Sequence, residues 1–306
     1  MSLIVLGSIG IDTVQTPDGV KKEEILGGSC TYFSAAASFY GPVRLVAAVG
    51  EDFPDEFKGV LGSFKGIDLE GLETRAGSKT FRWGGKYLED MDHRETLFTE
   101  LGVLGEAPPP VPESFKDSSH VFLANAHPAT QLAMLEAIPG KKLAVADTMD
   151  LWIDTANDEL RSLMTKIDGL VLNYDEAEQF TGKRNPVTAG KHLLELGPRF
   201  VVIKKGEHGA ILVHRDGIGA LPAYPTEDVV DPTGAGDSFA GGMMGSLAAN
   251  NAADPGSVES VLSALGHGTI IASFNVEQFS LGRLKELSKG EIDARYAEFS
   301  KMVRLS

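Results

Sequence analysis

Short, mostly apolar runs recur along the chain, and each one ends at a small or polar residue. They lie at residues 3–6, 43–50 (where Arg44 is the one charged residue), 121–124, 143–146, 170–172 and 201–203. Runs of this kind are typical of strands that are buried on both faces of a parallel sheet. Helical patterns follow several of them, for example at residues 53–64 and 131–138. The alternation predicts an α/β protein whose mainly parallel sheet carries helices on both faces.

Two segments depart from this rhythm. Residues 79–87 and 94–101 are rich in aromatic and β-branched side chains and flank a polar turn, which predicts a hairpin. We place this hairpin outside the main sheet, together with the turn-rich residues 13–26. The chain, residues 1–306, is then one domain with an inserted β lid built from about residues 13–26 and 77–104. A lid that closes over a site excludes water from it.

Three other segments complete the expected secondary structure. Residues 71–76 are expected to form a short connection. Residues 260–273 are rich in alanine and glycine and predict a helix that contains His267. Residues 284–303 predict a single charged, amphipathic helix at the C-terminal end.

Polar side chains stand where the predicted strands end, at Asp12, Asn125, Asp147, Asn173 and Lys204. Ligands of open α/β sheets bind outside the carboxyl ends of the strands. The pattern therefore predicts a binding site along this edge of the sheet, with Asn125 as a candidate substrate contact.

The most informative stretch is residues 231–242, which read Asp-Pro-Thr-Gly-Ala-Gly-Asp-Ser-Phe-Ala-Gly-Gly. The small residues Gly234, Ala235 and Gly236 allow a tight turn that leaves N–H groups uncovered at a helix start, where an anion is favoured. Asp237 stands at the same place, which makes it a candidate general base for a hydroxyl that attacks a bound phosphate. An ordinary glycine-rich loop with an aspartate cap is the alternative interpretation.

Residues 231–239 resemble the C-terminal signature of the ribokinase-like (PfkB) carbohydrate kinases, Asp-Thr-Thr-Gly-Ala-Gly-Asp-Ser-Phe, and only Pro232 departs from it. The likeness extends from Leu3 to about Gly282. It implies a three-layer αβα ribokinase-like fold with a mainly parallel sheet and a small β lid. It also implies transfer of a phosphoryl group from ATP to a hydroxyl, with Mg²⁺ as the cofactor.

The resemblance suggests an acceptor side made by Asp12 and the Gly27-Gly28 pair, which contact the sugar in this family. Without the resemblance, a local cap is the simpler interpretation of Asp12, and the glycines fit an ordinary turn equally well. Many members carry an asparagine four residues after the second glycine, where this chain has Tyr32. Arg82 on the hairpin is a further substrate candidate, with an ordinary solvated arginine as the alternative.

The resemblance also suggests a nucleotide side. The family carries Asn-x-x-Glu where this chain has Asn173 and Glu176, and there the glutamate organises Mg²⁺ through water. The same two residues also fit a capping box, which is a purely structural pattern. Lys204 and Gly206 occupy the place where the family approaches the nucleotide.

Two further assignments rest on the resemblance. His267 lies in the region that lines the adenine pocket, and a packed histidine is the alternative. Asp231 is a candidate ligand for a monovalent cation such as K⁺, and an ordinary turn residue is the alternative.

The composition limits the partners. A hydrophobic share of 42% supports a large core, whereas a net charge of −15 argues against nucleic acid or an anionic membrane as the main partner. Cys30 is the only cysteine, which excludes an intrachain disulfide and favours a reducing, cytoplasmic compartment. We expect neither a signal peptide nor a membrane span. The motifs of P-loop kinases, zinc proteases and serine hydrolases are absent from the sequence.

The leading hypothesis is phosphorylation of a small sugar by ATP, with Asp237 as the base and residues 234–237 as the anion hole. A nucleoside kinase of adenosine or inosine type shares the same apparatus and differs only on the acceptor side. A non-catalytic nucleotide- or sugar-binding protein on the same fold is the alternative of another class. Some relatives form homodimers through the lid, and this arrangement is also open here.

Overall fold

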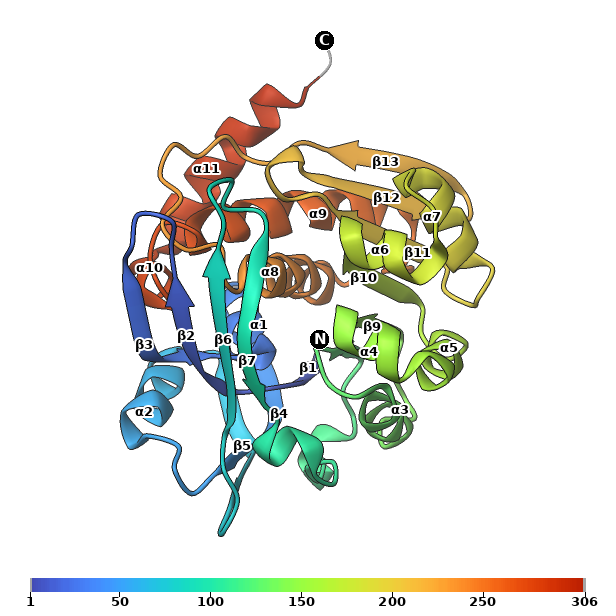
Figure 1. Cartoon of the computed structure of the whole chain (residues 1–306). Helices are drawn as coiled ribbons and strands as arrows, with labels where there is room; N and C mark the ends of the chain where they lie inside the picture. The colour runs from blue at the N-terminus through green and yellow to red at the C-terminus, as the bar shows by residue number, and fades with distance from the viewer. Residues whose placement is uncertain (1, 305–306) are drawn as a thin grey trace.

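The computed structural model describes residues 2–304, and within them a nine-stranded sheet forms the centre of the molecule (Figure 1). Its strands, in spatial order, are β13 (Gly217–Leu221), β12 (Ala210–His214), β11 (Phe200–Lys204), β10 (Gly169–Asn173), β9 (Leu143–Asp147), β8 (His120–Leu123), β1 (Leu3–Leu6), β4 (Val43–Gly50) and β5 (Ile67–Arg75). The strands from β11 to β5 are parallel, whereas β12 pairs antiparallel with β11, and β13 pairs antiparallel with β12. The predicted mainly parallel sheet is confirmed.

Helices cover both faces of this sheet. One face carries α1 (Ser29–Ala37), α2 (Asp55–Ser63), α8 (Ala235–Asn250), α9 (Val258–Asn275), α10 (Gly282–Glu286) and α11 (Lys289–Met302). The other carries α3 (Pro128–Glu136), α4 (Asp150–Thr155), α5 (Asn157–Met164), α6 (Tyr174–Thr181) and α7 (Pro186–Leu194). Alternate residues of β1 enter the two cores, since Leu3 and Val5 belong to the first cluster and Ile4 and Leu6 to the second.

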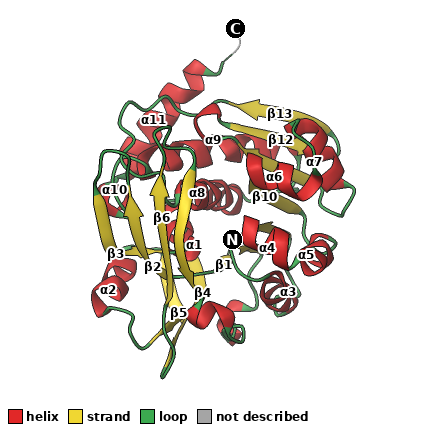
Figure 2. Cartoon of the chain, in the orientation of Figure 1, coloured by secondary structure: helices red, strands yellow, loops and turns green. Residues whose placement is uncertain are grey.

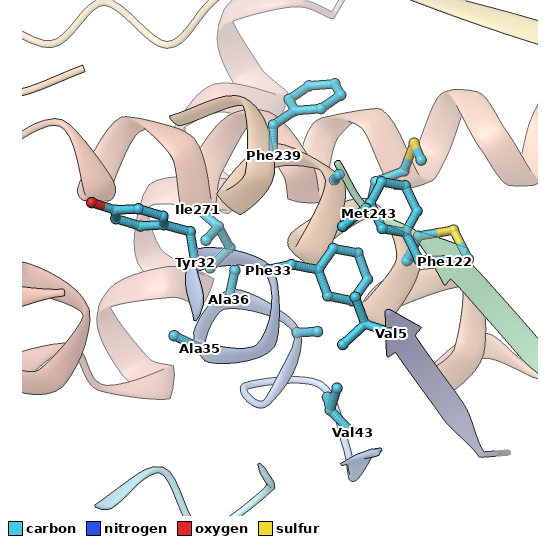
Figure 3. Packing of buried hydrophobic residues seen from close by; sticks show 14 of the residues in the cluster. Val5, Tyr32, Phe33, Ala35, Ala36, Val43, Phe122, Phe239, Met243 and Ile271 are labelled. Atoms are coloured by element: carbon cyan, nitrogen blue, oxygen red, sulfur yellow. The ribbon is translucent and has the colours of Figure 1, made fainter. Parts of the chain in front are cut away.

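The first core holds α1 and α8 together beneath the signature segment. Figure 3 shows Phe33 of α1 against Phe122 of β8, and the two rings stack with centroids 4.5 Å apart. Met243 and Phe239 of α8 belong to the same cluster. The start of α8 therefore has a rigid, apolar support.

A second, four-stranded sheet stands beside the main one (Figure 2). Its order is β3 (Lys21–Gly27), β2 (Gly10–Gln15), β6 (Phe81–Tyr87) and β7 (Arg94–Glu100). We call it the small sheet. It pairs the N-terminal strands 10–27 with the hairpin 81–100, and β2 and β6 lie parallel in its centre.

Two expectations about secondary structure were wrong. Residues 71–76 are not a connection, because Gly71–Arg75 form the end of β5 and pair with β4. The C-terminal segment is not one helix, because Ser288 starts α11 with its own cap after α10 has ended at Glu286. Strand β5 was not predicted because it is an edge strand with few buried side chains, so its sequence is largely polar. No helix within residues 2–304 combines the length and hydropathy that crossing a bilayer requires.

Candidate active site

The α8 start provides the backbone donors of the site. Gly234 has a left-handed φ of 75°, and α8 begins directly after it. The Ala235 amide donates to the Pro232 carbonyl at 3.1 Å, so it closes the turn and is not free. Within residues 2–304, the amides of Gly234, Gly236 and Asp237 donate to no acceptor. Free donors on the first turn of a 16-residue helix are suited to bind an anion.

Asp237 and Lys204 lie beside these donors. A Cβ atom at Gly236 would come within 2.7 Å of the Lys204 Nζ, so the lysine head group lies against the turn. Loss of hydration within the fold raises the pKa of Asp237 to about 6, and the positive charges of Lys204 and Arg94 offset part of this rise. A carboxylate with this pKa is largely ionised at neutral pH and can still accept a proton.

Asp231 anchors the turn from its start. This side chain is fully buried, and its Oδ1 accepts a hydrogen bond from the Thr233 amide at 2.9 Å. Asn275 of α9 donates through Nδ2 to the Thr233 carbonyl at 2.9 Å. The Asp231 Oδ2 atom has no protein partner among the described residues. The turn is therefore fixed by residues of two elements before any ligand binds.

Asp12 is another buried carboxylate of the site; it lies on the small sheet, next to the glycine pair. A Cβ atom at Gly27 would lie only 1.9 Å from the Asp12 Oδ2 atom, so glycine is required there. The Gly28 amide donates to Asp12, whereas Asp12 Oδ1 has no partner within residues 2–304. Burial, followed by the charges of Asp231 and Asp237, raises the pKa of Asp12 to about 8.

Asn173 and Glu176 form a complete capping box at the start of α6. Asn173 Oδ1 accepts from the Glu176 amide at 2.8 Å, and Glu176 Oε2 accepts from the Asn173 amide at 2.7 Å. Glu176 is nevertheless buried; burial raises its pKa, and Lys204 partly opposes that rise. No cluster of three or more side chains suited to a metal occurs between residues 2 and 304.

The chain is similar to known carbohydrate and nucleoside kinases. A family model described as pfkB family carbohydrate kinase matches residues 116–283. The cytidine kinase of Thermococcus kodakarensis is 32% identical over 252 residues, which cover 80% of this chain and 87% of that enzyme. The nucleoside kinase of Methanothermobacter thermautotrophicus is 30% identical, and the match covers 71% of this chain and 70% of that one.

This chain belongs to the PfkB carbohydrate kinase family. It is therefore a phosphotransferase that acts on a hydroxyl group with ATP as the donor. A solved E. coli protein, described as a putative ribokinase II in complex with ATP and Mg²⁺, has the same fold. Its TM-score is 0.78 at 19% identity, and 97% of this chain and 99% of that chain are aligned. The predicted ribokinase-like fold is confirmed.

The structure of this PfkB protein does not bring Arg82 to the site. Side chains alternate between the two faces of a strand, and Asp12 pairs in register with Trp83. Arg82 therefore lies on the opposite face of the small sheet. There it forms ion pairs with Glu24 at 3.3 Å and Asp52 at 3.4 Å. The expectation that Arg82 enters the cleft was wrong.

His267 and Asn125 are both occupied by neighbouring side chains. The His267 ring stacks on Tyr296 with centroids 4.2 Å apart and hydrogen-bonds Tyr40, and burial lowers its pKa to about 4. The packed-histidine alternative describes this residue better than a contact to adenine. Asn125 Oδ1 accepts from the Trp152 indole at 2.8 Å, so this oxygen is engaged within the protein.

Sequence reasoning placed Asp147 at this edge of the sheet without giving it a role, and it missed Arg94 altogether. Asp147 ends β9 and is buried with an unpartnered Oδ1; burial and the charge of Asp237 raise its pKa well above the usual range. Its position at a strand end was visible in the sequence, but no motif marked it. Arg94 of β7 is an exposed arginine whose charge reaches Asp237 and Glu176. Only the tertiary structure brings it near the site.

Proposed function

We propose that this PfkB kinase transfers the γ-phosphoryl group of ATP to a hydroxyl of a nucleoside. The observation that carries the reaction is the partly buried Asp237 beside unpaired helix amides and the Lys204 ammonium. Two relatives support the acceptor class, because a cytidine kinase and a nucleoside kinase each match more than two thirds of the chain. The sequence had favoured a sugar and left the nucleoside open.

Asp237 accepts the proton of the attacking hydroxyl as the bond to phosphorus forms. Its raised pKa of about 6 suits this role, since the group is ionised at neutral pH and basic enough to take the proton. General base catalysis of this kind is worth about 10²–10⁴-fold in rate. Asp147 is less suited to the role, because burial raises the pKa of its carboxyl group well above the usual range and so disfavours the ionised form that a base requires.

The donors around Asp237 stabilise the negative charge that spreads over the transferring group. The amides of Gly236 and Asp237 and the Lys204 ammonium are already oriented in the free protein, so they need no rearrangement when that charge develops. Gly206, in the turn after β11, has a left-handed φ of 52° that favours glycine, and the Asp92 carboxylate of the β6–β7 turn lies against it. We expect the nucleotide to approach beside this turn.

Metal binding fits a site built from few protein ligands. Glu176 uses Oε2 in its capping box, and the unpartnered Asp147 Oδ1 is an acceptor nearby. Mg²⁺ commonly binds through one or two carboxylates, waters and phosphate oxygens. When bound, it would neutralise the β and γ oxygens of ATP. Asp231 Oδ2 is the oxygen available to K⁺.

The acceptor is expected between the main sheet and the small sheet, which we propose acts as the lid. Asp12 carries a proton near neutral pH in the free protein, and it ionises when hydroxyl groups of the acceptor donate to it. Gly27 and Gly28 keep the backbone close to that carboxyl group. The small sheet also exposes Leu97 and Phe98, which favours the homodimer that the sequence left open. The mass of a Phe98→Glu variant in solution tests this arrangement.

The deciding experiment is an ATP-consumption screen with Mg²⁺ against cytidine, inosine, adenosine, ribose and fructose. We expect a nucleoside to give the highest kcat/KM and its ribose to carry the new phosphate. Faster phosphorylation of a free sugar would overturn the acceptor class and leave the kinase assignment intact. Tight binding of ATP and acceptor with no phosphoryl transfer across the panel would favour the non-catalytic alternative.

A further inference from the structure

The small sheet reaches the signature turn through one buried hydrogen bond. Tyr87 at the end of β6 and Thr233 in the turn place their hydroxyl groups 3.1 Å apart. The exposed fractions are only 4% for Tyr87 and 9% for Thr233. A buried hydroxyl pair of this kind is costly to leave unpaired, so the contact favours one relative position of the two segments.

Thr233 is held by three different parts of the fold. Its amide donates to Asp231, and its carbonyl accepts from Asn275 of α9. Its hydroxyl oxygen contacts Tyr87, which is the partner from the small sheet. Asn275 also accepts from Ser238 Oγ at 3.1 Å, which ties the same network to the first turn of α8.

The turn also rests on the main body. A Cβ atom at Gly234 would lie 2.3 Å from the ring carbons of Tyr32, so the aromatic face of Tyr32 packs directly against Gly234. Tyr32 belongs to α1 and is 1% exposed (Figure 3). Tyr32 of α1 thus packs against the turn, and Tyr87 of the small sheet forms a hydrogen bond with it.

The same small sheet carries Asp12. Strand β2 pairs directly with β6, and the register runs from Gly10 opposite Phe81 to Gln15 opposite Lys86. Asp12 and Tyr87 are therefore attached to one hydrogen-bonded unit. A shift of β2 caused by a ligand at Asp12 would be transmitted to Tyr87 and from there to Thr233.

We propose that Tyr87 is a positioning residue that couples the acceptor side of the site to the anion-binding turn through its hydrogen bond to Thr233. When an acceptor binds at Asp12, the small sheet takes up one fixed position. Tyr87 then holds the turn in the geometry that receives the phosphoryl group. The inference rests on the proposed roles of Asp12 and of the turn, but not on which acceptor is used.

The first test uses the full, ligand-free chain and amide hydrogen exchange. Tyr87→Phe removes the hydroxyl and keeps the ring, and Thr233→Val removes its partner with little change in shape. We expect the amides at position 233 and at Ser238 to exchange about three- to tenfold faster in each variant. The double variant should be no faster than either single one, because both remove the same bond.

Tyr224→Phe is the matched control. Tyr224 donates its hydroxyl to Glu298 at 3.0 Å on the C-terminal helix and makes no hydrogen bond to the turn. This variant should leave exchange at Ser238 unchanged. Exchange in Tyr87→Phe equal to that of the wild type, or additive effects of the two substitutions, would overturn the inference.

The second test separates positioning from mere stability. With cytidine or ribose, whichever is phosphorylated, Tyr87→Phe should lower kcat about five- to tenfold while KM for MgATP changes less than twofold. A structural role alone would lower Tm and leave kcat per folded enzyme unchanged, which would refute the coupling. If cytidine is inert but the exchange effect is present, the acceptor class is wrong and the role of Tyr87 stands.

Discussion

Two helices of this kinase each begin after a glycine with positive φ but use their first amides differently. Both α1 and α8 follow a glycine with positive φ, which is 95° at Gly28 and 75° at Gly234, and neither N-cap residue provides a side-chain cap. At α1, the Ser29 amide donates to Ser8 Oγ and the Cys30 amide to the Ser8 carbonyl. At α8, the second and third amides remain without an acceptor among the described residues.

The difference shows that a glycine before a helix does not by itself define an anion site. At α1, a neighbouring turn satisfies the orphan donors, so this helix start contributes rigidity. At α8, no protein group among residues 2–304 takes that place, and Lys204 adds a positive charge beside it. A helix start can bind a phosphate only where the surrounding fold leaves its donors open. The following changes test this contrast.

Replacing Asp237 by Asn should have the largest effect. The amide keeps the shape of the side chain but cannot accept the hydroxyl proton, so kcat should fall by about 10²–10⁴-fold. Steady-state kinetics with the best acceptor of the screen measure it. Near wild-type turnover would refute the role of Asp237 as the base.

The pH dependence sharpens the same prediction. Because Asp237 must be ionised, kcat/KM of the wild type should decline below about pH 6, where its raised pKa lies. The folded pKa exceeds the unfolded one, so the stabilising contribution of this group is lost as the pH rises through about 6. The free energy of unfolding of Asp237→Asn at pH 7 should therefore exceed that of the wild type by roughly 1–2 kcal/mol, which a higher urea midpoint would show. At pH 4 the two proteins should be equally stable.

Gly28→Ala should damage the fold at α1. The new Cβ would lie 2.6 Å from the Ser8 carbonyl oxygen and 2.7 Å from the Gly10 amide nitrogen, and both are backbone atoms that cannot easily move aside. With the added strain of the positive φ, we expect a loss of about 1–3 kcal/mol or more. Urea unfolding followed by circular dichroism measures it, and an unchanged midpoint would contradict the geometry.

Gly236→Ala should show the opposite pattern at α8. Its φ is not in the left-handed region, and the new methyl group would meet only the mobile end of Lys204 at 2.7 Å. Stability should be retained or rise slightly, since alanine favours helix. Activity should fall about tenfold or more, because the methyl group displaces the ammonium and covers the donors. The same urea and kinetic assays measure both effects. A loss of stability equal to that of Gly28→Ala would contradict the proposed difference between the two helix starts.

Ser8→Ala should have the smallest effect. It removes the acceptor of the Ser29 amide at 3.1 Å and uncaps α1, which costs about 1 kcal/mol. We expect kcat to stay close to that of the wild type when both are assayed well below their unfolding temperatures. A loss of activity comparable to that of Gly236→Ala would mean that α1 takes a direct part in phosphate binding.

Sequence reasoning found the signature turn but not its surroundings. The signature turn was recognisable because its chemistry lies within one continuous segment, from Asp231 to Asp237. Asp147 was given no role and Arg94 was missed, because each stands alone in its own segment. Arg82 was misassigned because the face on which it lies depends on the register between β2 and β6.

The sequence by itself determined the α/β alternation, the signature turn and the polar residues that stand at the ends of the strands. These features depend on local periodicity and on neighbours along the chain. Only the tertiary structure decided which amides stay unpaired, which carboxyl groups are buried and which tyrosines hold the turn. Those properties depend on residues far apart in sequence, such as Tyr87 and Thr233, whose contact exists only once the small sheet has docked against the turn before α8. Burial, pKa and free donors are set by such contacts, and so is the chemistry of the site.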